Sequence, residues 1–157
     1  MHGERGRQQA AVTLLTVFAV VDVLHTLLTI GHYEHRITVV THGEPDLYPA
    51  AFAYELFAHV VGPWQGAGVL SLIVAAAAVL MAVSCARGTP PADRATLGWL
   101  SATALLKSLS AVYDVVAAPP DPAVDGVLAT RPIAYPLWVA STTVLVIATR
   151  RLARAIR

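Results

Sequence analysis

Four long apolar windows constrain this chain more than any other feature. They cover residues 10–30, 66–86, 95–117 and 132–149. Crossing a hydrocarbon core of about 30 Å takes about 20 residues of helix, and each window is close to that length. Each is continuously apolar, whereas strands of a membrane barrel would alternate in polarity over about ten residues. The sequence therefore predicts an all-α fold, an integral membrane four-helix bundle that forms a single transmembrane domain over residues 1–157.

Composition indicates that the bilayer is the solvent of this chain. Hydrophobic residues make up 56% of the sequence, charged residues only 13%, and the mean hydropathy is +0.61. Soluble domains carry about twice that share of charge. The net charge is only +1 and no nucleic-acid-binding motif occurs, so we expect membrane lipids as partners and no nucleic acid. A single cysteine, Cys85, excludes an intramolecular disulfide and a thiolate metal cluster.

The distribution of cations predicts the orientation. Lys and Arg near the ends of spans favour the cytoplasmic side. The N-terminal flank, residues 87–94 and the C-terminal flank together hold eight arginines, whereas the other two connections hold only Arg36 and Arg131. An even number of spans satisfies this asymmetry. The chain is therefore predicted to lie in the cell (inner or plasma) membrane with both termini cytoplasmic.

The connections differ in kind. Residues 87–94 are expected to form a tight turn, since Pro90 and Pro91 oppose helix continuation. Residues 118–131, rich in Pro and Asp, are expected to form an exterior loop. The connection over residues 31–65 is far longer than a turn requires, and connections of that length usually hold structure or function.

Within that long connection, the sequence predicts a short interfacial or re-entrant helix over residues 49–61 on the outer side. Pro49 suits the first helical position, and Gly62-Pro63 ends the segment. The segment is too short to cross a membrane. It suits the outer interface because aromatic rings favour headgroup level, and it is flanked or lined by Tyr48, Phe52, Tyr54, Phe57 and Trp64.

Two ionisable residues lie near the middle of predicted spans. Asp22 is just past the centre of the first and Lys107 just past the centre of the third. A charge at the bilayer centre costs about 2.5–3.5 kcal/mol even on lenient scales. Both spans run outward in the predicted topology, so the two residues share one depth within about 3 Å. An ion pair between them would relieve both costs.

Further polar residues follow this pair toward the outer ends of the same spans. Spacings of three, four and seven place these residues on one face of each helix. We therefore predict a polar cavity that opens outward, capped by Glu55 and His59 of the interfacial helix. The candidate binding or acid–base residues are Asp22, His25, His32, Lys107, Asp114, Glu55 and His59.

Each candidate also has a structural interpretation. The Asp22–Lys107 pair would fix helix register. His25 would hydrogen-bond to a neighbouring helix, and Asp114 would be hydrated near the headgroups. Glu55 and His59 would form a solvated face of a surface helix. The histidines of the long connection would be exposed groups of an outer loop, namely His32, His35 and His42.

The function predicted first is binding of, or acid–base chemistry on, a hydrophobic lipid-like or isoprenoid-like small molecule. A mixed cluster of acids and cations moves the pKa values of an acid and a base apart. The alternatives are a small proton-coupled transporter, since intramembrane acid and histidine chains move protons, and a non-catalytic assembly or quinone-binding subunit of a larger membrane complex. The sequence leaves open whether the protein is an enzyme. It also leaves open a homo-oligomer or a membrane partner subunit.

No cofactor or metal is predicted. Haem held across a bundle normally needs histidines on two facing helices, and His25 is the only histidine deep within a predicted span. His32, His35 and His59 would gather with Glu34 or Glu55 only at the outer surface. Their sequence is not a zinc motif of high specificity.

Overall fold

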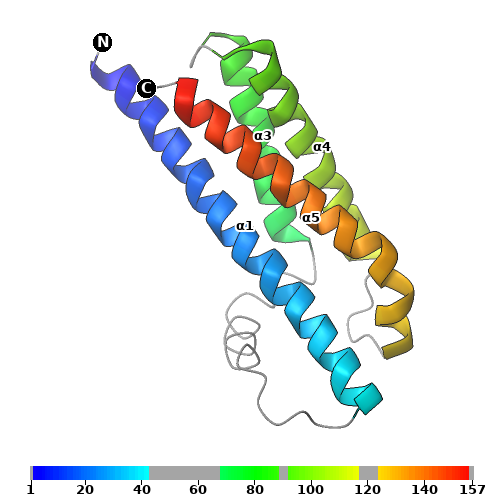
Figure 1. Ribbon diagram of the computed structural model, residues 1–157. Helices are drawn as coiled ribbons and strands as arrows, with labels where there is room; N and C mark the ends of the chain where they lie inside the picture. The colour runs from blue at the N-terminus through cyan, green and yellow to red at the C-terminus, as the bar shows by residue number, and fades with distance from the viewer. Residues whose placement is uncertain (1, 43–67, 89–91, 117–123, 156–157) are drawn as a thin grey trace.

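The computed structural model is all-helical in the part it describes, which comprises residues 2–42, 68–88, 92–116 and 124–155. Four helices fill these ranges (Figure 1): α1 (His2–His42), α3 (Val69–Ala86), α4 (Arg94–Val116) and α5 (Val124–Ala155). Three of them contain segments long and apolar enough to cross a membrane. These segments are Gln8–Gly31, Val69–Ala86 and Pro132–Ala155.

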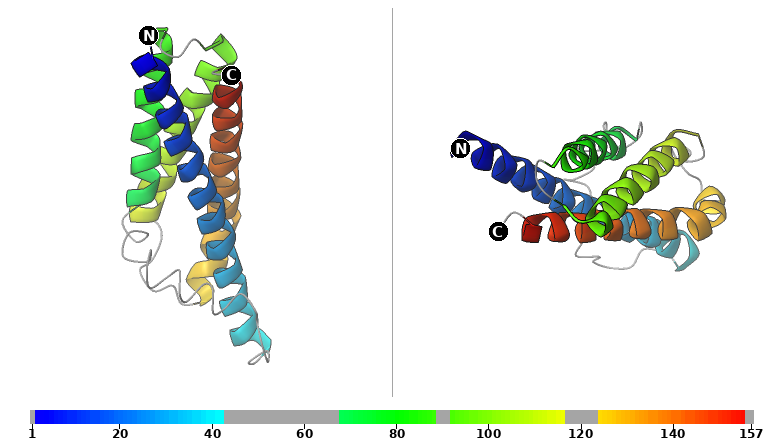
Figure 2. Two further views of the ribbon diagram at one scale, coloured as in Figure 1. Left: turned by 90° about the vertical axis from the view of Figure 1, so that its left-hand side faces the viewer. Right: turned by 90° about the horizontal axis from the view of Figure 1, so that it is seen from above.

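The helices form one elongated bundle. α3 lies against α4, α4 against α5 and α5 against α1, while α1 and α3 are in much looser contact. The start of α1 and the end of α5 lie at the same end of the bundle, here called the termini end (Figures 1 and 2). The opposite end is called the far end. An arrangement with both ends of the chain on one side is what an even number of crossings produces.

Side chains that face the bundle interior recur at alternating intervals of four and three residues. On α1 these buried residues are Leu15, Ala19, Asp22, Thr26 and Thr29. This spacing keeps one face of a helix turned toward its neighbours in left-handed bundles. The same spacing gives buried stripes on the other long helices: Thr96, Leu100, Thr103, Lys107 and Ser110 on α4, and Ser141, Leu145, Ala148 and Leu152 on α5.

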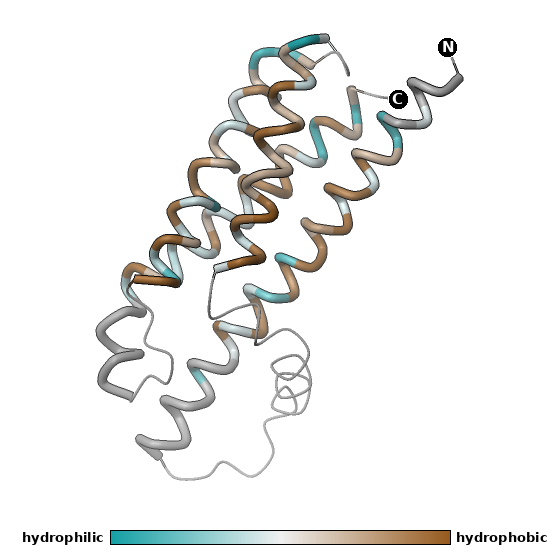
Figure 3. Tube along the Cα trace, turned by 180° about the vertical axis from the view of Figure 1, so that it is seen from behind, coloured by the Kyte–Doolittle hydropathy of each residue, from teal (hydrophilic) through white to brown (hydrophobic). Residues whose placement is uncertain are grey.

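The bundle is layered along its length. The apolar core occupies the termini half, where Leu15, Val74, Leu100, Leu145 and Leu152 meet. Hydrophilic positions on α1 and α4 interrupt the apolar helices nearer the far end (Figure 3). The described interior as a whole holds nearly as many polar as apolar buried residues. Large apolar side chains instead cover the outside of all four helices.

α4 shows clearly how polar side chains lie inside the bundle and apolar side chains outside it. Its 23 residues reach about 34 Å, yet it does not contain one of the three segments that are apolar enough to cross a membrane. Several of its polar side chains, among them Thr103 and Lys107, are buried, while Leu105 is 70% exposed and Val112 57% exposed. Much of the polar character of α4 therefore faces the other helices.

α1 is longer than the predicted span 10–30. It has 41 residues and continues through His42, so its far end projects beyond the bundle (Figure 1). The prediction that His32, His35 and His42 belong to a loop is therefore wrong, because the backbone is helical at all three positions. After Gly31 no proline occurs before Pro45, and one glycine costs only about 1 kcal/mol in a helix.

α5 also begins earlier than predicted. It starts at Val124, inside the segment expected to be a loop, and runs through Pro132 and Pro136. Internal prolines remove a helix hydrogen bond and bend the axis, and the first turns of α5 diverge from its later direction (Figure 1). The predicted helix over residues 49–61, with Glu55 and His59, lies outside the described residues.

Candidate functional site

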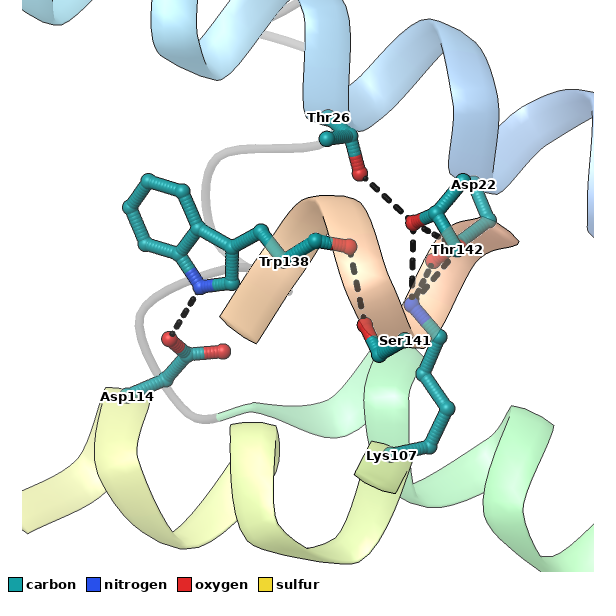
Figure 4. A network of polar contacts seen from close by, with 7 residues as sticks. All are labelled: Asp22, Thr26, Lys107, Asp114, Trp138, Ser141 and Thr142. Atoms are coloured by element: carbon teal, nitrogen blue, oxygen red, sulfur yellow. Dashed lines mark hydrogen bonds and ion pairs between the residues drawn. The ribbon is translucent and has the colours of Figure 1, made fainter. Parts of the chain in front are cut away.

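Asp22 of α1 and Lys107 of α4 form a buried ion pair (Figure 4). The Lys107 Nζ lies 2.7 Å from Asp22 Oδ1 and 2.6 Å from Asp22 Oδ2. Only 3% of each side chain is exposed. Each residue belongs to the inward stripe of its helix, and the two stripes meet at the same depth. The contact that the sequence left open is therefore formed.

A hydroxyl network ties this pair to α5. Thr142 Oγ1 donates to Asp22 Oδ2 at 2.6 Å and lies 3.4 Å from Lys107 Nζ. Thr26 Oγ1 lies 2.9 Å from Thr142 Oγ1. Because Thr142 has one hydroxyl hydrogen and gives it to Asp22, Thr26 is the donor in that bond. The network joins α1, α4 and α5 and satisfies both charges.

A second polar contact lies two turns farther along α4. Asp114 Oδ1 accepts a hydrogen bond of 3.1 Å from Trp138 Nε1 of α5 (Figure 4). The Trp138 ring stacks on Tyr135, with ring centroids 6.0 Å apart and an interplanar angle of 30°. Ser141 Oγ donates to the Trp138 carbonyl oxygen at 3.0 Å. The Asp114 carboxylate is thus held between α4 and α5 on the far-end side of the ion pair.

His25 connects these groups on the α1 side. It lies three residues after Asp22, is partly buried, and is close enough to interact electrostatically with both Asp22 and Lys107. Lys107 in turn interacts electrostatically with Asp114. Four ionisable side chains therefore form one electrostatically connected cluster, here called the polar cluster: Asp22, His25, Lys107 and Asp114.

The structure brings together the described members of the predicted site. Thr29, on the same face of α1, is also buried. His32 lies farther along α1, and its side chain is outside the described part, as are Glu55 and His59 entirely. The outward-opening cavity predicted beneath that cap stays a prediction.

Three participants were missed by the sequence analysis. Thr26 and Thr142 complete the network around the ion pair, and Trp138 holds Asp114. A signal for Thr26 existed, because it lies four residues after Asp22 on the same helix face. The run Ser141-Thr142-Thr143 inside an apolar segment was the signal on α5. Nothing in the sequence pairs Trp138 with Asp114.

Between the polar cluster and the charged residues at the termini end lies a stretch of the bundle without acidic, basic or histidine side chains. Between the polar cluster and the termini end, no Asp, Glu, His, Lys or Arg occurs in residues 8–21, 69–86, 95–106 or 143–149. Among the side chains that the structure describes, no three from His, Cys, Asp and Glu gather closely enough to hold a metal ion. The chemistry offered by the described cluster is that of carboxylates, an amine and an imidazole.

Comparison of the chain with protein-family models, curated proteins and solved structures gave no match. No relative therefore assigns a role to the polar cluster. Its chemistry follows from the contacts given above.

Proposed function

We propose that the chain is a multi-pass integral membrane protein of the cell membrane, with α4 as a fourth span and both termini cytoplasmic. The inverted distribution of side chains supports this proposal, because Leu and Val cover the outside while Thr, Ser, Asp and Lys lie inside. In water such a surface would be an extended apolar patch. The position of both chain ends at one end of the bundle agrees with four crossings.

Cysteine labelling tests this topology. In a Cys85→Ser background, Gly88→Cys places a thiol in the connection between α3 and α4, and Asp121→Cys places one between α4 and α5. An impermeant maleimide applied to intact cells is expected to label Asp121→Cys and to label Gly88→Cys only after permeabilisation. The opposite pattern would invert the topology. Labelling of both variants in intact cells would contradict a crossing by α4.

The proposed function is binding of a hydrophobic, lipid-like or isoprenoid-like small molecule at the polar cluster, with His25 and Asp114 as its acid–base groups. The observation that carries this proposal is that His25 and Asp114 flank a pair whose charges already satisfy each other. The Asp22–Lys107 pair, with Thr142, suffices to join three helices. An additional imidazole and carboxylate in the same apolar surroundings are not needed for that purpose and suit a polar ligand head.

The stretch without charged or histidine side chains on the termini side of the polar cluster favours this function over proton-coupled transport. A proton path across the membrane needs exchangeable groups on both sides of its centre. In the described helices no acidic, basic or histidine side chain lies between the polar cluster and the charged residues of the termini end, and an apolar core fills that stretch. A site reached from one side suits a ligand that enters from the membrane or the outer surface.

Photo-labelling tests the site. The full chain in liposomes is irradiated with a diazirine analogue of a farnesyl alcohol, and the labelled peptides are identified by mass spectrometry. We expect label on α1 or α4 near the cluster and a severalfold loss in His25→Gln and in Asp114→Asn. Asp93→Asn is the matched control, since it makes the same carboxylate-to-amide change at an exposed position outside the cluster. Equal labelling of all four proteins would refute the proposed site.

A further inference from the structure

A groove runs between α1 and α5 on the termini side of the polar cluster. Its volume is about 450 Å³, within the range of small-molecule sites. Its α1 wall reaches from Thr16 to Leu24, two turns or about 12 Å of helix. Apolar side chains form most of the α1 wall, among them Ala19 and Val20, and half of the α5 wall, namely Val146 and Ala153.

Two residues of α5 with polar side chains border the groove. Thr149 contributes only non-polar atoms to the lining, because its hydroxyl is buried and does not reach the groove surface. Arg150 follows it, lines the same groove with the aliphatic part of its side chain, and is exposed.

Arg150 differs from its neighbour Arg151. Arg151 Nη1 lies 3.6 Å from Asp93 Oδ2, whereas Arg150 forms no ion pair with any described residue. The groove thus combines an apolar channel with an adjoining guanidinium that has no acidic partner in the described part of the chain. Guanidinium groups recognise phosphate through two parallel hydrogen bonds.

We infer that this groove binds an anionic phospholipid of the surrounding membrane. One acyl chain lies along α1 and α5, and the phosphate is bound by Arg150. The inference rests on the membrane insertion proposed above, but not on the ligand of the polar cluster. Arg150 then lies at the cytoplasmic leaflet, which is rich in anionic lipid and attracts basic residues.

Native mass spectrometry of the full chain in detergent tests this inference, with phosphatidylglycerol and phosphatidylcholine as probes. We expect tighter binding of phosphatidylglycerol, and a loss of about fivefold in affinity for Arg150→Gln, the effect of one interfacial cation. Arg154→Gln is the matched control, because Arg154 is exposed on the same helix and does not line the groove. It is expected to change binding less than twofold, an effect of about 0.4 kcal/mol.

Variants that fill the groove provide a second test of lipid binding. Ala153→Phe and Val146→Phe each place a ring in the groove, and both are expected to abolish phosphatidylglycerol retention without lowering the melting temperature. Two variants are used so that one that fails to fold does not decide the outcome. Three results would each overturn the inference: equal losses in Arg150→Gln and Arg154→Gln, equal binding of both lipids, or unchanged retention in a folded groove-filling variant. None of them depends on photo-labelling at His25 or Asp114, so the two proposals fail separately.

Discussion

Asp22 Oδ2 and Lys107 Nζ lie 2.6 Å apart although 85 positions separate the two residues in the chain. Neither residue faces the outside, and Thr142 adds a donor to the same carboxylate. A buried pair of this kind is tolerated only when its geometry is good and its remaining hydrogen-bonding groups are satisfied. The network meets both conditions. It therefore ties α1 to α4 and α5 at one register.

The first prediction concerns this pair. Asp22→Asn leaves the Lys107 ammonium buried without its counter-charge, and Lys107→Met leaves the Asp22 carboxylate without its own. Each single change is expected to lower the free energy of unfolding by about 3–5 kcal/mol. The double variant Asp22→Asn/Lys107→Met should recover most of that loss, because it leaves no unpaired charge. Unfolding of purified protein in mixed micelles measures all three.

The double variant decides what the pair does. Recovery would make the pair a structural connection, with ligand chemistry left to His25 and Asp114. If all three variants are as stable as the wild-type protein, the two charges contribute nothing to the fold and would themselves be candidates for the ligand site. Additive losses in the double variant would show that the two residues act independently and would contradict the contact.

The second prediction concerns the hydroxyl bridge. Thr142→Val keeps the side-chain shape but removes the donor to Asp22 and the acceptor for Thr26. A hydrogen bond to a charged group contributes about 1.5–3 kcal/mol, so we expect a loss of that size. Thr103→Val is the matched control, because Thr103 is also buried and its hydroxyl donates to the Trp99 carbonyl oxygen of its own helix. Equal losses in the two variants would contradict the bridge.

The apolar windows predicted the helical fold well because a membrane-crossing helix needs a long uninterrupted run, which a single sequence displays directly. The positions of Asp22 and Lys107 in their windows also predicted their common depth. Helical rise converts sequence position into height along the bundle, so two residues in parallel helices can be matched without knowing which helices touch.

The residues that the sequence did not reveal depend on which faces meet across helices. Thr142 and Trp138 are ordinary components of an apolar segment until α5 is placed against α1 and α4. The ends of α1 and α5 were missed for a different reason. The windows followed hydropathy, but a helix ends where the backbone is interrupted, and α1 continues past residue 30 into polar sequence. α5 starts ahead of Pro132 because two prolines bend it without ending it.

The third prediction concerns Gly68, which precedes α3. Its φ is +60°, and a Cβ atom there would lie 2.8 Å from the Ala111 carbonyl oxygen and 2.9 Å from the Ala111 Cα. Those atoms belong to the α4 backbone and cannot rotate away. Gly68→Ala is therefore expected to destabilise the protein by about 2–4 kcal/mol, through strain and through separation of α3 from α4. Thermal unfolding of the purified variant measures it.

Gly98 is the matched control for that change. It lies inside α4, and a Cβ atom there meets nothing within 4 Å. Gly98→Ala should stabilise the protein by up to about 1 kcal/mol, because alanine favours the helix. Destabilisation by both variants, to the same extent, would contradict the close approach at Gly68.

The fourth prediction concerns pH and the start of α4. Asp93 Oδ1 accepts a hydrogen bond of 2.7 Å from the Thr96 backbone N–H, and the Asp93 carbonyl accepts from the Leu97 N–H at 3.1 Å, so Asp93 caps the helix. The Thr96 side chain and backbone, with a smaller effect of Arg151, hold the pKa of Asp93 below its ordinary value of 3.8. A carboxylate with a lowered folded pKa stabilises the fold above its unfolded pKa and loses that effect as pH falls through the folded pKa.

Asp93→Asn isolates this charge because asparagine also caps a helix but does not titrate. The wild-type protein should melt at a higher temperature than Asp93→Asn at pH 7. This difference in melting temperature should shrink as pH falls below about 4. It should vanish once Asp93 is protonated, since both residues are then neutral caps. Asp93→Ala should stay less stable at every pH, because it lacks a cap. A gap between wild type and Asp93→Asn that is as large at pH 3 as at pH 7 would mean that the charge of Asp93 does not stabilise the start of α4.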